Sequence, residues 1–501
     1  MQQFIVLPLI IPLLMALTAL ARLRSFRRRL ALIGALANLL ACIALLIITE
    51  TGNIQVSQMG GHPAPYGISL VVDPLSAMML TITAIILFTS VIYSRTAIDA
   101  NRERFNYYPL LGCLLLGINL AFMTGDLFTL YVAFEIMLMS SFVLLTLGGE
   151  RGQLEGGLKY VILNVVGSTV FLIAVGLTYA VAGTLNLADL AQRLAGVVPE
   201  SRDMTTVLAG LFLLAFGIKA AIFPLFFWLP ASYHTPPIAI TALFGGLLTK
   251  VGVYSMWRVL VMVFPNELVV LQPLLLALAM LTMITGVLGA VAQMELRRLL
   301  SFHIISQIGY LLMGTALLTE AGLAGAVFFM IHVILAKTAL FYISGIVYEA
   351  QGSYDLKKLG GMRKMHPGVA LLFLLAAFSL AGLPPLSGFW AKLLLIRAAL
   401  EIGQYGVVAV ALVVSLLTMY SMVKIWNEAF WKPPAAGRAA AMLTRDDRRS
   451  LFFPASVLVI LIVIVGLFAE PMIRLSSQAA RSIIEPGVYI ESVLVENGDG
   501  E

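Results

Sequence analysis

Apolar runs long enough to cross a lipid bilayer recur along almost the whole chain, and most charged residues lie in the short segments between them. A transmembrane helix needs about 20 mostly apolar residues, and that window divides the chain into about fourteen spans. Their expected limits are 4–21, 29–49, 73–94, 107–124, 126–147, 157–182, 205–228, 236–261, 268–291, 299–319, 321–348, 367–396, 403–427 and 451–473. The pattern predicts an all-α membrane protein.

Composition excludes a soluble fold. The chain is 60% hydrophobic and 12% charged, whereas about a quarter of the residues in a soluble domain are charged. The net charge of +6 does not point to nucleic acid, because the basic residues lie in short loops between apolar runs. Cys42 and Cys113 lie singly inside apolar runs, so we expect neither a disulfide nor a metal site. The first apolar run lacks a charged leader and a small-residue cleavage site, so we interpret it as a retained span.

Lys and Arg concentrate in the loops that follow odd-numbered spans, which predicts that these loops face the cytoplasm. The loops are 21–29, 95–106, 150–159, 294–298, 357–364 and 428–450. The opposite side has a 50–72 loop without basic residues, a 183–204 loop with Arg193 and Arg202, and the acidic tail 496–501. We therefore expect both termini on the external, periplasmic side of the cell inner (plasma) membrane. Alternation and Gly-Gly in 50–72 predict a short external β-hairpin.

Few ionisable residues lie deep in these spans, where a charge costs between about 2.5 and 17 kcal/mol. The candidates for proton translocation are Glu135, Lys219, Lys250, His332, Lys337 and Lys392. Because Glu135 is the only deep carboxylate, the lysines cannot all be paired ions, and some must release and take up protons. Such a series is what a proton path requires. Arg258 and Lys424, near the ends of their spans, are interpreted as residues that extend to the membrane interface.

His332 and Lys337 share one span but are five residues apart, so on an ideal helix they point about 140° apart. They can serve one path only if the helix has a π-bulge or if the path turns between its two faces. His332 is the stronger candidate, because histidine titrates near neutral pH without help.

Two spans contain proline and glycine in positions that an uninterrupted helix does not tolerate. Pro224 breaks the seventh span, and the twelfth is broken by Gly382, Pro384, Pro385 and Gly388. Unwound backbone at membrane depth survives only where protein buries it or where it lines a wet cavity.

The two broken spans are five apart, which predicts two five-helix units (spans four to eight and nine to thirteen) that run in opposite directions as an inverted repeat. Each broken span carries a buried lysine. We expect four parts: N-terminal helices with the hairpin (1–106), the first repeat (107–261), the second repeat (268–427), and a cytoplasmic loop with the last span and tail (428–501).

Several motifs together resemble one family. They are DLFTLYVAFEIM around Glu135, the Lys219 segment leading into FPLFFWLP, GGLLTKVGVY around Lys250, SFHIISQIGY, and AGLPPLSGFWAK ending at Lys392. The chain resembles, over essentially its whole length, the antiporter-like subunits of respiratory complex I, membrane-bound hydrogenases and the multisubunit Mrp cation/proton antiporters. VAFEIMLMSS, TALFGGLLTKVG and Lys instead of Glu at position 392 favour the Mrp type.

The resemblance implies a proton-translocating subunit of a sodium (or potassium)/proton antiporter, a transporter component rather than an enzyme. Glu135 and Lys219 would form a switchable ion pair, Lys250 would be the central proton carrier, and His332 would relay toward Lys392. The implied partners are a larger homologue, small hydrophobic subunits and the lipid bilayer. No Gly-rich phosphate loop or Cys cluster is found in the sequence, so no redox cofactor is expected.

Three alternatives remain open. The first is a proton-pumping subunit of an NADH:quinone oxidoreductase or a related hydrogenase, with redox energy as the driver. The second is a stand-alone transporter for a small solute, although the buried charges form a series rather than one pocket. The third is a membrane scaffold without transport, which the cost of so many buried lysines opposes.

Overall fold

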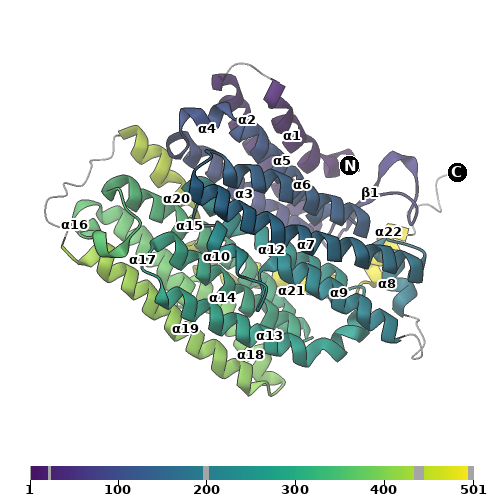
Figure 1. Ribbon diagram of the computed structural model, residues 1–501. Coiled ribbons are helices and arrows are strands. Elements are labelled where there is room, and N and C mark those ends of the chain that lie inside the picture. Colours follow the sequence, from purple (N-terminus) through teal and green to yellow (C-terminus); the bar gives the residue numbers. More distant parts are fainter. Residues whose placement is uncertain (1, 21–23, 196–201, 434–444, 495–501) are drawn as a thin grey trace.

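Long helices build the structure and lie side by side across the molecule (Figure 1). The computed structural model describes residues 2–20, 24–195, 202–433 and 445–494. The first elements are η1 (Gln2–Val6), α1 (Leu7–Leu17), η2 (Thr18–Leu20), α2 (Arg24–Glu50), β1 (Gln55–Gln58), η3 (Met59–Gly61), β2 (Ser69–Val72), α3 (Pro74–Ala97), α4 (Ala100–Arg104), α5 (Tyr107–Met123), α6 (Leu127–Thr146), α7 (Arg151–Ala182), α8 (Leu187–Ala195), α9 (Arg202–Ala220), α10 (Trp228–Ser232), α11 (Ile238–Leu243), η5 (Phe244–Leu248), α12 (Thr249–Met256) and η6 (Trp257–Val261). They are followed by α13 (Pro265–Ala292), α14 (Leu296–Ala316), α15 (Glu320–Gln351), η7 (Leu356–Lys358), α16 (Met362–Met365), α17 (Pro367–Ala381), α18 (Ser387–Glu401), α19 (Tyr405–Ile425), η8 (Trp426–Trp431), α20 (Arg445–Leu467), α21 (Ala469–Ile484) and α22 (Gly487–Leu494).

The expected all-α membrane architecture is confirmed. Within the described residues, eleven helices are long and apolar enough to cross a membrane. Three shorter apolar helices accompany them, over Phe4–Leu17, Tyr107–Met123 and Pro367–Ala381. Every expected span overlaps one of these segments. Because a bilayer needs about 20 apolar residues, the three short helices leave the total of fourteen crossings a prediction.

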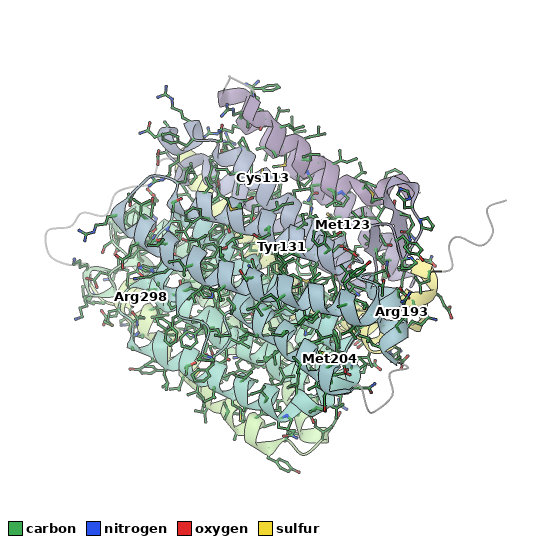
Figure 2. The ribbon with its side chains drawn as sticks, turned by 45° about the vertical axis from the view of Figure 1, so that its right-hand side comes forward. Cys113, Met123, Tyr131, Arg193, Met204 and Arg298 are labelled. Atoms are coloured by element: carbon green, nitrogen blue, oxygen red, sulfur yellow. The ribbon has the colours of Figure 1, made fainter. Side chains whose placement is uncertain are left out.

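The basic loops gather at one end of the helices, as alternating spans require. The contacts that join them are Arg28 with Glu103, Arg102 with Glu150, Gly156 against Ala231, Arg297 with the Pro236 carbonyl, Glu295 with Asp355, and Gly361 with Lys432. Figure 2 shows Arg298 at this end and Arg193 at the other. Parts of loops 21–29 and 428–450 lie outside the described residues.

The opposite end holds the segment that was expected to form a hairpin. Strands β1 and β2 pair antiparallel, with Gln55 opposite Val72. Both η1 and α22 pack against β1, so the two described ends of the chain lie at the same end of the molecule (Figure 1). The 183–204 loop contributes α8, while Arg202 begins α9. The acidic tail at 496–501 lies outside the described residues.

Helix α21 is an amphipathic helix that ties the hairpin end together. It packs against α3 and α15. Arg474 bonds to Glu50 at the end of α2, and Arg481 bonds to Glu320 at the start of α15. Both pairs are exposed, and such pairs contribute at most about 1 kcal/mol each. They fix the position of α21 rather than supplying most of its binding energy.

The interpretation of Arg258 as an interface residue is wrong. Only 3% of Arg258 is exposed, and its guanidinium bonds to Asp73, which caps the start of α3 and is itself fully buried. Ser482 of α21 donates to the same carboxylate at 3.1 Å. The pair joins residues 185 positions apart, so no local pattern could predict it.

We expect Asp73→Asn to destabilise the protein by about 3–5 kcal/mol, because it leaves the Arg258 charge buried without its partner. Asparagine still caps a helix as well as aspartate does, so the loss reports the contacts of the carboxylate with Arg258 and Ser482. The measurement is thermal unfolding of the purified protein, with Glu155→Gln in the exposed pair Glu155–Lys159 as the control. An unchanged unfolding midpoint for Asp73→Asn would contradict this role.

The Asp73–Arg258 pair should also make the stability of the protein fall at acidic pH. Burial alone would raise the pKa of Asp73, but the charge of Arg258 and the hydrogen bonds from Arg258 and Ser76 hold it below its ordinary value. Because the pKa of Asp73 is lower in the folded state, the carboxylate stabilises the fold fully above its unfolded-state pKa, near 4. This stabilisation is lost as pH falls through the folded-state pKa. Asp73→Asn should remove this part of the acid dependence.

Candidate functional site

The six predicted residues lie on five long helical segments that run through the middle of the molecule. Glu135 is on α6, Lys219 on α9, Lys250 on α12, Lys392 on α18, and both His332 and Lys337 are on α15. The four lysines and His332 are buried, with exposed fractions between 0 and 7%, whereas Glu135 is half-buried. In the part of the chain that the structure describes, none of the four lysines lies within 4.0 Å of a carboxylate. Each amine donates to carbonyl or hydroxyl oxygens instead.

Lys219 lies in the last turn of α9, just before the first break. Its amine donates to the Asn164 carbonyl at 3.0 Å and to the Ser168 hydroxyl at 2.7 Å, both on α7. The amine also lies 5.6 Å from the ring centre of Phe134, the neighbour of Glu135 on α6. By changing rotamer, the Lys219 side chain can direct its amine either toward α7 or toward α6.

Side chains form hydrogen bonds with backbone groups that the break after α9 leaves unpaired. Pro224 lies in the unwound segment between α9 and α10, as expected. The Phe223 amide donates to Thr282 on α13 at 3.0 Å, and the Trp228 indole donates to the Ile218 carbonyl at 3.0 Å. These partners replace the bonds that an uninterrupted helix would make, so the unwound backbone is stable in a buried position.

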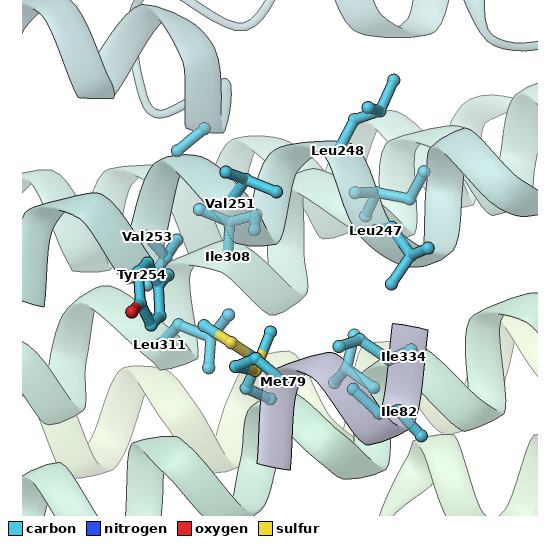
Figure 3. Close-up of a cluster of buried hydrophobic side chains, with 14 of the residues drawn as sticks. Met79, Ile82, Leu247, Leu248, Val251, Val253, Tyr254, Ile308, Leu311 and Ile334 are labelled. Atoms are coloured by element: carbon cyan, nitrogen blue, oxygen red, sulfur yellow. The ribbon is translucent and has the colours of Figure 1, made fainter. Parts of the chain in front are cut away.

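Lys250 lies directly after a π-helical turn, η5, and is fully buried. Its amine donates to the Gly245 carbonyl of that turn at 2.6 Å. Gly252 lets this helix approach the first break closely, because a Cβ there would lie 2.9 Å from the Ala220 nitrogen. The sequence neighbours of this lysine, Leu247, Leu248 and Val251, belong to a cluster of buried hydrophobic side chains (Figure 3). Lys250 is thus held in a dry environment beside the helix that carries Lys219.

His332 and Lys337 face different neighbours, because α15 runs as an α-helix without a π turn. The His332 Nδ1 atom is 2.9 Å from the Ser387 hydroxyl on α18, whereas the Lys337 amine is 3.4 Å from the Leu300 carbonyl on α14. Of the two arrangements considered from the sequence, the structure has the one in which a path would turn between the two faces of this helix.

The second break separates α17 from α18 and holds Gly382, Pro384 and Pro385, while Gly388 is the second residue of α18. Gly382 has a φ of +94°, a conformation that favours glycine. A Cβ at Gly388 would overlap the Ser379 carbonyl and lie 2.8 Å from the His332 ring. Glycine at 388 therefore lets α18 pack directly against His332.

Lys392 reaches back across this break from α18. Its amine donates to the Ala381 carbonyl and to the Ser415 hydroxyl on α19, each at 2.9 Å. Ala381 is the last residue of α17, so its carbonyl is one of those that a helix end leaves unpaired. The amine also lies 5.2 Å from the ring centre of Tyr310 on α14.

The two breaks share one electrostatic feature. Lys219 belongs to the final turn of the half-helix before its break, and the Lys392 amine binds the final carbonyl of the half-helix before the other break. The C-terminal end of a helix carries the negative end of its dipole, which stabilises a cation. At each break the dipole offsets part, but not all, of the cost of a buried ammonium group, even though the two lysines lie on opposite sides of their breaks in sequence.

Glu135 does not pair with Lys219 in this arrangement. Its Oε1 atom is buried without a hydrogen-bond partner among the described residues. The two groups thus stand apart, with the lysine held by α7. The ion pair that the sequence resemblance implies is therefore not formed in this structure.

Sequence reasoning missed the hydroxyls that hold these groups. Ser168, Ser387 and Ser415 each bond to one of the charged or titratable side chains. A serine on an apolar helix face was the only available signal, and many serines in this chain instead bond back to their own helix. No group of three or more His, Cys, Asp or Glu side chains that could hold a metal was found among the described residues.

Comparisons with known proteins identify a family. Residues 124–418, more than half of the chain, match the family model described as NADH:quinone oxidoreductase/Mrp antiporter, TM. The chain is 42% identical to the D-type subunit of the Na(+)/H(+) antiporter of Alkalihalophilus pseudofirmus, covering 99% of this chain and 100% of that protein. The D-type subunit of the Bacillus subtilis antiporter is 39% identical over the same shares.

Two solved structures have similar folds. A chain of the Mrp complex from Dietzia sp. DQ12-45-1b superposes with a TM-score of 0.92 at 32% identity, covering 99% of this chain and 100% of that one. A chain of respiratory complex I from Thermus thermophilus gives a TM-score of 0.82 at 25% identity, with coverages of 96% and 99%.

Proposed function

This chain belongs to the family of NADH:quinone oxidoreductase/Mrp antiporter transmembrane proteins, and from that premise we propose that it translocates protons as the D-type subunit of a multisubunit sodium/proton antiporter. The full-length similarity to two Na(+)/H(+) antiporter subunits of the D type supports this function over a redox-driven pump. It is a transporter component rather than an enzyme.

The proton path is inferred from the contacts of the four buried lysine amines. Each amine is held by neutral oxygens, without a carboxylate in contact among the described residues. A fixed ammonium ion in such surroundings is costly, whereas a neutral amine is not. Groups balanced between the two forms can accept a proton from one neighbour and release it to the next.

The first step of the proposed mechanism is a switch between Glu135 and Lys219. When Lys219 turns toward α6, the carboxylate holds its charge. When it turns toward Asn164 and Ser168, as in this structure, the carboxylate no longer holds its charge, and in the proposed cycle that charge disfavours a proton on Lys250. At an effective dielectric constant of about 20, two unit charges 4 Å apart interact by about 4 kcal/mol, so a small movement is sufficient.

In the second step, the proton that leaves Lys250 moves toward His332 and then Lys392. His332 bonds to Ser387 at the start of α18 and lies 3.5 Å from Ser379 at the end of α17. It therefore touches both halves of the broken helix that carries Lys392. Lys337, on the other face of α15, can accept the proton before the path turns.

The energy must come from a partner, since one chain supplies only the path. We propose that the chain works beside a larger homologue and small hydrophobic subunits, and that sodium or potassium movement through the complex opens the Glu135–Lys219 couple. The protein is a multi-pass membrane protein, and we place it in the cell inner (plasma) membrane with both termini external. We also propose that the chain has four parts, at 1–106, 107–261, 268–427 and 428–501.

The far end of the path is tested by Lys392→Met, which keeps most of the bulk of the side chain but cannot carry a proton. We expect sodium-dependent proton movement to fall by about 10²-fold or more, because a positioned proton carrier contributes about 10²–10⁴-fold. The assay is acidification or alkalinisation of everted vesicles that contain the complete complex, in a host without other sodium/proton antiporters.

Arg397→Met is the matched control, because Arg397 lies on the same helix but is exposed and pairs with Glu401. It should retain transport within about twofold, as expected for an exposed pair of little energetic weight. Wild-type transport by Lys392→Met would exclude this residue from the path.

A further inference from the structure

A small cavity lies beside Lys219, between α6, α7, α9, α10 and the π-helical turn that precedes Lys250. Its volume is about 20 Å³, and its walls include Lys219, Asn164, Tyr160, Tyr233 and Leu248. A water molecule needs about 10–15 Å³ of such space and two to four polar partners. The cavity is therefore large enough for one water, and it is polar on the side of Lys219.

Tyr233 contributes a buried hydroxyl to this cavity wall. The residue is 0% exposed, and its hydroxyl has no hydrogen-bond partner among the residues that the structure describes. Leaving a buried hydroxyl unpaired is unfavourable, and phenylalanine would avoid that cost. A hydroxyl at this position therefore indicates a partner other than the protein.

Lys219 has a hydrogen available for the same cavity. A lysine ammonium group has three donors, and the protein accepts two of them, at Asn164 and Ser168. The amine lines the cavity together with Tyr233. One water placed there would accept from Lys219 and bond to the tyrosine hydroxyl.

The other side of Tyr233 leads to the helix of Lys250. The Tyr233 ring packs against Phe244, with ring centres 5.6 Å apart. Phe244 begins the π-helical turn whose Gly245 carbonyl holds the Lys250 amine. Leu248, in the same turn, forms part of the cavity wall. Tyr233 thus lies between the cavity of Lys219 and the turn that carries Lys250.

We propose that Tyr233, with one water in this cavity, forms the proton connection between Lys219 and Lys250. The inference rests on the proposed proton function and names a residue that this function does not include. The Lys219 ammonium gives one proton to the water, the water gives one to the tyrosine oxygen, and the hydroxyl releases its own proton toward Lys250. Both the water and the tyrosine end neutral, so one proton has moved and no other group has changed.

Tyr233→Phe tests the connection by removing only the hydroxyl. We expect the maximal rate of sodium-dependent proton movement by the complete complex to fall about tenfold, below the full effect of losing a proton carrier because water can replace part of the route. The sodium concentration that gives half the maximal rate should stay unchanged, and so should the thermal unfolding midpoint, since the lost hydroxyl has no protein partner among the described residues.

Tyr160→Phe is the matched control, because Tyr160 lines the same cavity but its hydroxyl is already bonded to Ser141 at 2.6 Å. The rate of proton movement should stay within about twofold of the wild-type rate, since the Tyr160 hydroxyl is already paired within the protein. A second variant, Leu138→Phe, fills the cavity from the α6 wall and should lower the rate as Tyr233→Phe does.

Wild-type rates for Tyr233→Phe, or an equal loss for Tyr160→Phe, would overturn the connection through Tyr233. Those results would leave the proposed function intact as long as Lys250→Met abolishes transport in the same vesicles. Transport that survives Lys250→Met would instead contradict the proposed function itself.

Discussion

Neutralising either member of the Glu135–Lys219 couple is expected to lower sodium-dependent proton movement by about 10²–10⁴-fold, the range that a positioned proton-transfer group contributes. The suitable variants are Glu135→Gln and Lys219→Met. Glu135→Gln keeps the size of its side chain, and Lys219→Met keeps most of the apolar bulk of the lysine beside the 20 Å³ cavity. The loss follows because one charge alone cannot alternate between a bound and a separated state.

The exposed pair Glu155–Lys159 on α7 offers a control of the same chemistry. Glu155→Gln and Lys159→Met should leave transport unchanged, because an exposed pair contributes at most about 1 kcal/mol. Co-purification of the partner subunits with each variant shows that the complex still assembles. Antiport at the wild-type rate in Glu135→Gln or Lys219→Met complexes would eliminate the switch.

The architecture could be predicted from sequence because its signals are local. Apolar runs of bilayer length fix where helices form, and each expected span overlaps an apolar helix. Pro224, and Gly382 with Pro384 and Pro385, mark the two helix breaks that the structure has. The basic loops gather at one end because alternating spans place them there.

Interactions between distant residues could not be predicted in this way. Arg258 looked like an interface residue because Asp73, its partner, lies 185 positions earlier. The π turn before Lys250 also has no clear sequence mark, since Phe244–Leu248 reads as ordinary apolar helix.

The candidate residues themselves were predictable, whereas their surroundings were not. A lysine inside an apolar run stands out in any window. Which oxygens hold it depends on packing, as with Lys219 against Asn164 and Ser168 from α7. Tyr233 illustrates the same limit, because a tyrosine in an aromatic-rich chain carries no signal until its hydroxyl is found without a protein partner among the described residues.

Lys250 is the central carrier of the proposed proton path. Its substitution should lower proton transport as much as substitution of Glu135 or Lys219. It is fully buried and its amine is held by one carbonyl, that of Gly245. Its helical segment contacts both α9, which carries Lys219, and α15, which carries His332, so in the proposed path it passes the proton between the two halves of the chain. Lys250→Met keeps the bulk of the side chain and removes its proton.

The most direct measurement is proton flux driven by an imposed sodium gradient in liposomes that contain the complete complex, compared between wild type and Lys250→Met. Ser255→Ala is the control, because Ser255 lies on the same helix and its hydroxyl bonds back to Val251. We predict flux at the background level of empty liposomes for Lys250→Met and near the wild-type level for Ser255→Ala. Proton flux at the wild-type rate through assembled Lys250→Met complexes would contradict a proton path along the buried lysines of this chain.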